Sequence, residues 1–206
     1  MKNPTPVRGA AAAAKPSPPK GHPAHEVRII GGQWKRTRLK VPDRPGLRPT
    51  PDRVRETLFN WLGQDLSGWV CLDAFAGTGA LGFEAASRGA ASALLVESDP
   101  ALVAQLQATR KRLDATAVQV QRGDGLVALG RVAPASLDLV LLDPPFDAGL
   151  FDSALAAAAK AVAPGGFVYL EAPQAWSDER LQAMGLVLRR HLKAGAVHAH
   201  LLQRAA

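Results

Sequence analysis

The sequence has little of what secreted and membrane proteins depend on. Cys71 is the only cysteine among 206 residues, so no disulfide can form within the chain. Because it lies in an apolar run, we expect a buried thiol in a reducing compartment. No apolar stretch approaches the ~20 residues that span a bilayer, and Ala10 to Ala14, flanked by proline and lysine, make no signal core. We expect a cytoplasmic protein without a membrane segment.

Acidic residues are missing from the first 25 positions, where four basic residues lie among proline and alanine. That composition indicates that residues 1–26 form a disordered basic tail. Residues 27–60 contain nine basic and three acidic side chains, a net charge of +6, whereas residues 61–206 contain twelve basic and fourteen acidic ones, a net charge of −2. A basic module beside a near-neutral body is typical of polyanion binding, and a solvated basic face is the alternative.

The basic module, residues 27–63, is predicted to be a β-hairpin followed by a linker and a helix. Residues 27–30 and 37–41 are β-prone, and a Gly-Gly-Gln-Trp segment connects them. A proline-punctuated linker over 42–49 leads to a helix that Thr50 can cap, with Pro51 at its first position and Gly63 just past its end.

The side chains of this module have different predicted surroundings. Arg53 and Arg55 are expected to face solvent. Trp34 at the hairpin tip either stacks on an unpaired base or anchors the hairpin to the body, and packing is the commoner outcome for a single tryptophan. Helical spacing places four apolar side chains against the body: Val54, Leu58, Trp61 and Leu62.

From residue 69 onward, short apolar runs alternate with helical stretches, which is typical of a parallel sheet covered on both faces. Strands are predicted at residues 70–75, 92–97, 117–122, 137–142 and 166–171, with helices at 80–88, 100–113, 148–163 and 177–184. The last two strands, 186–192 and 196–203, are joined by so short a loop that they must form an antiparallel hairpin. Residues 64–206 therefore resemble the α/β, seven-stranded, Rossmann-like fold of class I methyltransferases that depend on S-adenosylmethionine (SAM), with residues 27–63 as an N-terminal extension.

The loop after the first of these strands contains the pattern G-x-G-x-x-G at Gly77, Gly79 and Gly82, and Glu97 follows at the spacing of a ribose-binding acid. Alone, this pattern fits a nicotinamide or flavin enzyme equally well. Asp73 argues against those cofactors, because its carboxylate would face their pyrophosphate. SAM has no phosphate and has two cationic groups that acids can accompany.

The predicted SAM site combines this loop with acids from neighbouring strands. Glycines let the backbone approach the ligand, and Glu97 could bind the ribose hydroxyls. Asp124 either accepts from the adenine amine or caps the loop in Gly123-Asp124-Gly125. The residues predicted to bind SAM are Asp73, Phe75, Gly77, Thr78, Gly79, Glu97, Asp124 and Asp143.

Asp143-Pro144-Pro145-Phe146 follows the apolar run 137–142. Proline has no N–H and forces the preceding residue into an extended conformation, so the Asp143 carboxylate and the Pro144 carbonyl are fixed acceptors. Together they can bind both hydrogens of an exocyclic NH2 group, while Phe146 offers a face for the ring. An ordinary proline turn after a strand is the alternative interpretation.

Six sequence motifs follow one another along the chain. They are Arg28 to Trp34, residues 46–50, residues 52–62, the glycine loop, Glu97-Ser98-Asp99, and Asp143 to Phe146. In these motifs the chain closely resembles the bacterial 16S ribosomal RNA guanine-N2 methyltransferase family. The resemblance is strong over residues 27–150 and rests on topology beyond them. Its N-terminal motifs are family-specific, whereas the glycine loop and the proline tetrapeptide occur across many methyltransferases.

The resemblance implies methyl transfer from SAM to the exocyclic N2 of one guanine, guanine 966 in the usual numbering, in 16S rRNA. It implies a substrate within the small ribosomal subunit or its late assembly intermediate, and catalytic roles for Asp143, Pro144 and Phe146. The basic hairpin and linker would bind phosphates and place the nucleotide, and a monomer is expected. The predicted RNA-binding residues are Arg28, Trp34, Lys35, Arg36, Arg38, Arg48, Arg53 and Arg55.

Three other functions fit part of the sequence. A DNA adenine-N6 methyltransferase would use the same tetrapeptide but is expected to have a target-recognition region. A protein glutamine methyltransferase usually has asparagine where this chain has Asp143. A non-catalytic RNA-binding or assembly factor would need the basic module alone. No metal site is predicted, since His198 and His200 share a strand face without a nearby acid or cysteine.

Overall fold

A computed structural model describes residues 26–42, 50–146 and 148–205. The N-terminal part of this range is a short antiparallel ribbon, β1 (Glu26–Arg28) and β2 (Arg38–Lys40), followed by helix α1 (Asp52–Trp61). The predicted hairpin and helix are confirmed, with shorter strands than expected. Glu26 begins β1, one residue inside the predicted tail, and the rest of that tail lies outside the described residues.

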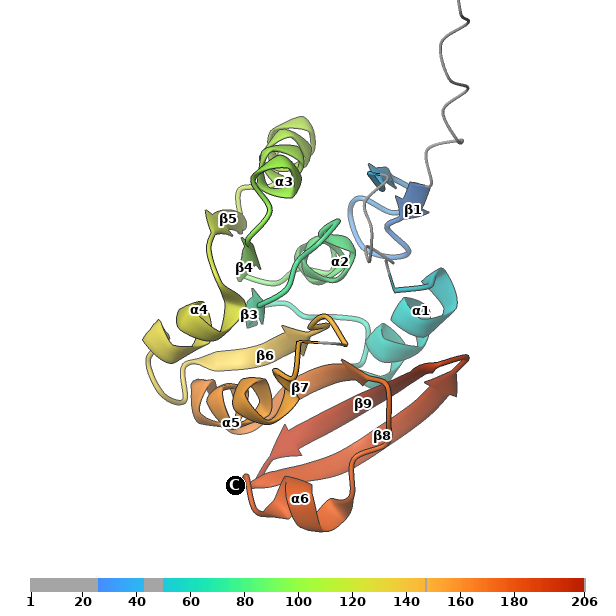
Figure 1. The fold of residues 1–206 in the computed structure, drawn as a ribbon. Coiled ribbons are helices and arrows are strands. Elements are labelled where there is room, and N and C mark those ends of the chain that lie inside the picture. The colour runs from blue at the N-terminus through green and yellow to red at the C-terminus, as the bar shows by residue number, and fades with distance from the viewer. Residues whose placement is uncertain (1–25, 43–49, 147, 206) are drawn as a thin grey trace, which may run out of the picture.

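The main sheet has seven strands in the order β5-β4-β3-β6-β7-β9-β8 (Figure 1). The first five pair in parallel, while β9 is antiparallel to both β7 and β8, so the predicted C-terminal hairpin is confirmed. The strands are β3 (Val70–Asp73), β4 (Ser92–Glu97), β5 (Val118–Arg122), β6 (Leu137–Leu142), β7 (Val162–Ala172), β8 (Leu186–Ala194) and β9 (Val197–Arg204).

Helices cover both faces of this sheet. On one face α1, α2 (Ala80–Ser87) and α3 (Pro100–Arg112) pack in one hydrophobic cluster, and on the other α4 (Gly125–Arg131), α5 (Phe151–Ala161) and α6 (Asp178–Gln182) pack in a second. Cys71 is buried in the first cluster, as predicted, and burial raises the pKa of its thiol to about 12. Val27, Ile29 and Leu39 of the ribbon belong to the same cluster, and Figure 1 shows the ribbon beside α2.

Several details differ from the sequence prediction, and β3 ends at Asp73 rather than at 75. Helix α4 was not predicted, because it is short and contains two glycines. Helix α5 begins at Phe151 rather than at 148, after Gly149 with a φ of 63°. Strand β7 begins four residues earlier than expected. Pro51 rather than Thr50 is the N-cap of α1, and no side chain caps that helix.

None of the helices within the described ranges has the length and apolar character needed to cross a membrane.

Candidate active site

The carboxyl ends of the parallel strands meet at one edge of the sheet, and acidic residues lie at three of them. Asp73 ends β3, Glu97 ends β4, and Asp143 directly follows β6. Strand β3 lies between β4 and β6, so the three acids come from adjacent strands. In doubly wound α/β sheets this edge is where ligands bind.

The glycine loop between β3 and α2 has a backbone conformation that depends on glycine. Gly77 and Gly79 have φ angles of 53° and 80°, and Gly79 is the left-handed N-cap of α2. A side chain at Gly79 would also meet Leu106 and Phe83 at 2.6 Å. The loop therefore needs glycine both for its conformation and for its packing.

Asp73 lies beneath this loop with one oxygen unsatisfied. Its Oδ2 accepts a 2.9 Å hydrogen bond from the Gly82 N–H, whereas Oδ1 is buried without a partner among the described residues. Burial raises the pKa of the Asp73 carboxyl to about 7; the Gly82 N–H opposes this, and the charge of Glu97 adds to it. A buried acceptor without a protein donor fits a site where a bound group donates a hydrogen bond.

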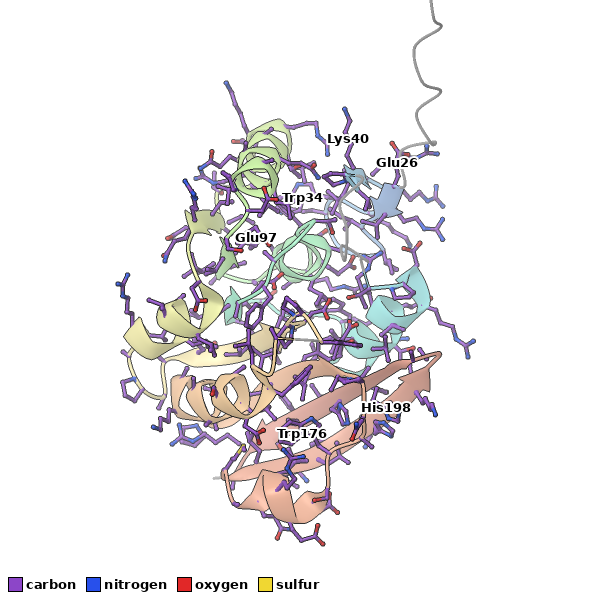
Figure 2. The ribbon with its side chains drawn as sticks, in the orientation of Figure 1. Glu26, Trp34, Lys40, Glu97, Trp176 and His198 are labelled. Carbon is purple, nitrogen blue, oxygen red and sulfur yellow. The ribbon has the colours of Figure 1, made fainter. Side chains whose placement is uncertain are left out.

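Glu97 and Asp124 both bond to backbone groups nearby. Glu97, labelled in Figure 2, accepts from the N–H groups of Gly77 and Asp99, at 2.8 Å each, and so fixes the glycine loop to β4. Asp124 is the exposed N-cap of α4 and accepts from the Val127 N–H at 2.9 Å. Asp124 thus caps a helix, as the second of its two interpretations expected. Its contact with adenine stays a prediction.

The proline tetrapeptide leaves β6 at the same edge. Asp143 is partly buried, Pro144 is buried, and Phe146 is 39% exposed with its ring centroid 6.1 Å from that of Phe151. Burial raises the pKa of the Asp143 carboxyl well above its usual range, and the charges of Glu171 and Asp73 raise it further. The site thus has an aromatic face beside a carboxyl whose pKa is raised.

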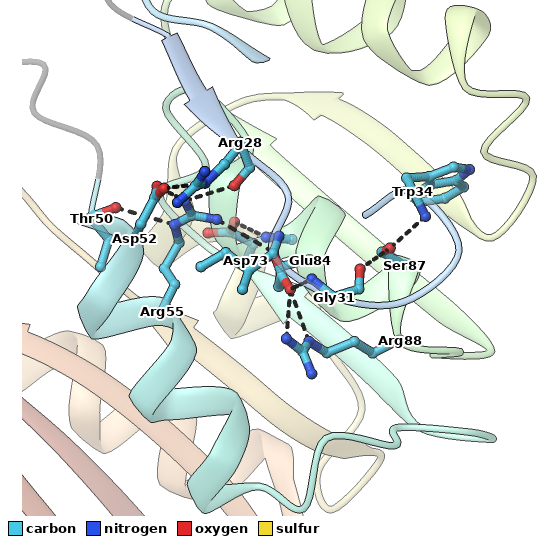
Figure 3. A network of polar contacts seen from close by, with 12 residues as sticks. Arg28, Gly31, Trp34, Thr50, Asp52, Arg55, Asp73, Glu84, Ser87 and Arg88 are labelled. Carbon is cyan, nitrogen blue, oxygen red and sulfur yellow. Dashed lines mark hydrogen bonds and ion pairs between the residues drawn. The ribbon is translucent and has the colours of Figure 1, made fainter. Parts of the chain in front are cut away.

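The predicted solvent exposure of Arg55 is wrong, because this side chain is fully buried in a polar network (Figure 3). Its Nη2 donates to the Arg28 carbonyl at 2.8 Å and to Asp52 at 2.6 Å, and its Nη1 lies 3.4 Å from Glu84. A guanidinium whose contacts are all internal is not available to RNA phosphates. Helical spacing explains the error, since Arg55 shares a face with Leu58, Phe59 and Leu62.

Glu84 in α2 is the centre of this network. It accepts from the N–H groups of Ile30 and Gly31 at 2.7 Å each, and from Arg88 at 2.8 to 2.9 Å. Gly31 is also held by the Ser87 hydroxyl, which donates to its carbonyl at 2.6 Å. The turn of the N-terminal hairpin is therefore fixed to the helix that begins at the glycine loop.

The other predicted RNA contacts have varied surroundings. Arg28 and Arg38 are exposed in ion pairs with Asp52 and Glu26, at 2.8 and 2.9 Å. Trp34 is partly buried against the first hydrophobic cluster, so it packs as the anchoring interpretation expected. Arg48 lies outside the described residues. The remaining three are exposed: Lys35, Arg36 and Arg53.

Sequence reasoning missed Glu84 and Glu171 as functional candidates. Glu84 is the only charge in an otherwise small and apolar helix, and Glu171 lies between two buried residues of a central strand. A charge predicted to be buried needs a partner, and that requirement was the available signal. The partners come from segments that the sequence does not place nearby.

The C-terminal hairpin brings three histidines together. His191 Nε2 lies 2.9 Å from His198 Nδ1, and buried His200 accepts from the Trp176 N–H at 3.2 Å. Over the described part of the chain, no group of three histidine, cysteine or acidic residues is arranged to hold a metal ion.

A glycine loop, a strand-end acid and a proline tetrapeptide at the carboxyl edge of this seven-stranded sheet define a class I methyltransferase fold. The family model described as "Conserved hypothetical protein 95" matches residues 27–203, and the chain belongs to this family.

Named relatives agree with this assignment. Ribosomal RNA small subunit methyltransferase D from Escherichia coli is 48% identical over 130 residues, which cover 63% of this chain and 65% of the relative. The Haemophilus influenzae protein of the same name is 36% identical over 179 residues, covering 80% of this chain and 92% of that one. A solved Escherichia coli structure named as a methyltransferase has a TM-score of 0.74 at 37% identity, covering 88% of this chain and 99% of that one.

Proposed function

We propose that the chain transfers a methyl group from SAM to the exocyclic N2 of a guanine in 16S rRNA. The observation that most supports this is the position of Asp143 to Phe146 beside the glycine loop, at the edge where Asp73 keeps an unsatisfied buried oxygen. The names of the relatives support small-subunit rRNA as the substrate.

The residues of the loop fit a cationic, phosphate-free donor. The loop supplies Gly77 and Gly79, and Asp73 and Glu97 accept hydrogen bonds from the N–H groups of Gly82 and Gly77. These acids would repel a pyrophosphate but accompany an ammonium or sulfonium group. Phe75, Thr78, Asp124 and Asp143 complete the proposed donor site. SAM would supply an electrophilic methyl group there.

The tetrapeptide would bind and orient the acceptor. A guanine amine is a weak nucleophile because its lone pair is conjugated with the ring. Hydrogen bonds from the amine to the Asp143 carboxylate and the Pro144 carbonyl would turn that lone pair toward the donor, which is catalysis by positioning. Phe146, exposed at the edge, would stack on a base flipped or looped out of the RNA.

The exposed cations of the N-terminal module would hold the RNA backbone. Three cations are exposed and accessible to phosphates: Lys35, Arg36 and Arg53. Arg28 and Arg38 form exposed ion pairs, which are weak enough to be replaced by contacts to phosphate. We propose that the substrate is the small subunit or a late assembly intermediate, and that the protein acts as a monomer.

Transfer of radiolabelled methyl groups tests this function against its rivals. Undermethylated small subunits, naked 16S rRNA, DNA and a protein substrate would be compared, with Asp143→Ala as the inactive variant and Asp138→Ala, on the same strand, as the matched control. We expect label in rRNA only, lost in Asp143→Ala. Preferential labelling of DNA or protein, or full activity of Asp143→Ala, would contradict the proposal.

A further inference from the structure

Glu171 is a buried carboxyl that the transfer described above does not use. It is 3% exposed near the end of β7, and its Oε1 accepts from the Thr50 hydroxyl at 2.6 Å and from the Tyr169 hydroxyl at 3.0 Å. A buried carboxylate is costly unless donors satisfy it. Two hydroxyl donors on one oxygen favour the ionised form of Glu171.

The sheet register makes Glu171 a neighbour of Asp143. Leu141 pairs with Tyr169 and Leu142 with Leu170 in the parallel strands β6 and β7. The next residues on the two strands are Asp143 and Glu171, and alternation places both on the face of Leu141 and Tyr169. Adjacent strands lie ~4.8 Å apart, so two carboxyls on one face at this position are close enough to interact strongly.

We propose that Glu171 is a positioning residue for Asp143, and that a negative charge on Glu171 makes the Asp143 carboxylate a stronger proton acceptor for the methylated amine. The inference rests on the proposed function and deepens it. In this proposal Glu171 acts through Asp143 and has no direct role toward substrate or donor. Its hydrogen bond to Thr50, which lies after the basic linker and two residues before the start of α1, sets its position.

The proton has to leave the amine at some stage of the reaction. The amine nitrogen forms a bond to the methyl carbon while the bond from that carbon to the donor sulfur breaks, and the electron pair stays on sulfur. The nitrogen then has a positive charge and releases one proton, which the Asp143 carboxylate accepts. An aspartate with a pKa of ~3.9 would be a poor base at neutral pH. A raised pKa brings the proton affinity of the carboxylate closer to the operating pH and makes it a better base.

The charge of Glu171 raises the pKa of Asp143 above that of an ordinary aspartate, so the Asp143 carboxylate is a stronger base once it is ionised. Burial raises the pKa of Glu171, and the hydroxyls of Thr50 and Tyr169 and the charge of Arg55 offset only part of this rise. For Asp143, burial raises the pKa, and the charges of Glu171 and Asp73 raise it further. Burial also raises the pKa of Tyr169, so this phenol remains a donor.

The test uses Glu171→Gln, which keeps the size of the side chain and removes its charge. Single-turnover methyl transfer to undermethylated subunits would be measured against pH, and the Asp143 carboxyl would be titrated by carbon NMR without donor or RNA. We expect the acidic limb of the rate profile and the carboxyl titration both to move down by about one pH unit. The maximal rate should fall while the KM for the subunit stays constant.

Three further variants complete the test. Thr50→Val, which removes the hydroxyl donor, should move both midpoints in the same direction by less. Thr50→Ser should restore the wild-type midpoints, and Glu179→Gln on the surface should leave them unchanged.

The outcomes separate this inference from the proposed function. Unshifted midpoints in Glu171→Gln, with Asp143→Ala inactive, would overturn the inference and leave the function standing. Full activity of Asp143→Ala would overturn the proposed acceptor site, and the inference with it.

Discussion

Arg55 in α1 and Glu84 in α2 form an ion pair in which both side chains are fully buried, with Nη1 and Oε2 3.4 Å apart. Glu84 also holds the hairpin turn through two backbone N–H groups. Glu84 of α2 thereby joins this helix to both the N-terminal hairpin and α1. A buried pair of this kind stabilises little in itself, but it makes the loss of one partner costly.

Glu84→Gln should therefore lower the free energy of unfolding by about 3–5 kcal/mol, since two buried guanidiniums lose their shared counter-charge. Denaturant titration measures this change. Glu56→Gln, exposed on α1, is the matched control and should change stability by less than about 0.5 kcal/mol. Equal effects of the two substitutions would show that the network does not hold the hairpin.

Asp73 predicts a pH dependence of stability. Its pKa in the folded protein, about 7, is higher than the ordinary value of 3.8. The folded state therefore keeps a proton that the unfolded state releases, and the stability that this proton contributes is complete below about pH 4 and is lost between about pH 4 and pH 7. Asp73→Asn should remove a slope of about 1.4 kcal/mol per pH unit in that window. Parallel stability curves for the two proteins would contradict the assignment.

Exposed cations of the N-terminal module should set the salt dependence of RNA binding. Lys35→Ala and Arg53→Ala should each weaken binding and reduce the slope of log affinity against log salt by about one, because each removes one phosphate contact. Filter binding to 16S rRNA measures the slope. Arg131→Ala, exposed on α4 across the sheet, is the control, and the prediction fails if it has the same effect.

Phe146→Ala should weaken capture of the target base. Stacking on an aromatic side chain contributes ~1–3 kcal/mol per base, so the KM for the RNA should rise about tenfold or more. Phe146→Tyr keeps the ring and should remain close to wild type. If Phe146→Ala leaves both KM and rate unchanged, the target base does not stack on Phe146.

Local patterns predicted the ends of the strands better than the contacts between distant segments. Asp73, Glu97 and Asp143 could be placed at one edge because hydrophobic runs fix where parallel strands end. Arg55 and Glu84 are 29 residues apart, and Thr50 and Glu171 are 121 apart. Such pairs depend on how helices pack across the sheet, which periodicity does not specify. Helix α4 was missed for a local reason, its glycines at 125 and 130.

The most direct test of the account is nucleoside mass spectrometry of 16S rRNA after undermethylated small subunits are incubated with SAM and this protein. We predict one new N2-methylguanosine per rRNA with the wild-type protein and none with Asp143→Ala, while Asp138→Ala remains active. A methyl group on adenine, no methylated nucleoside at all, or equal product from Asp143→Ala would contradict it.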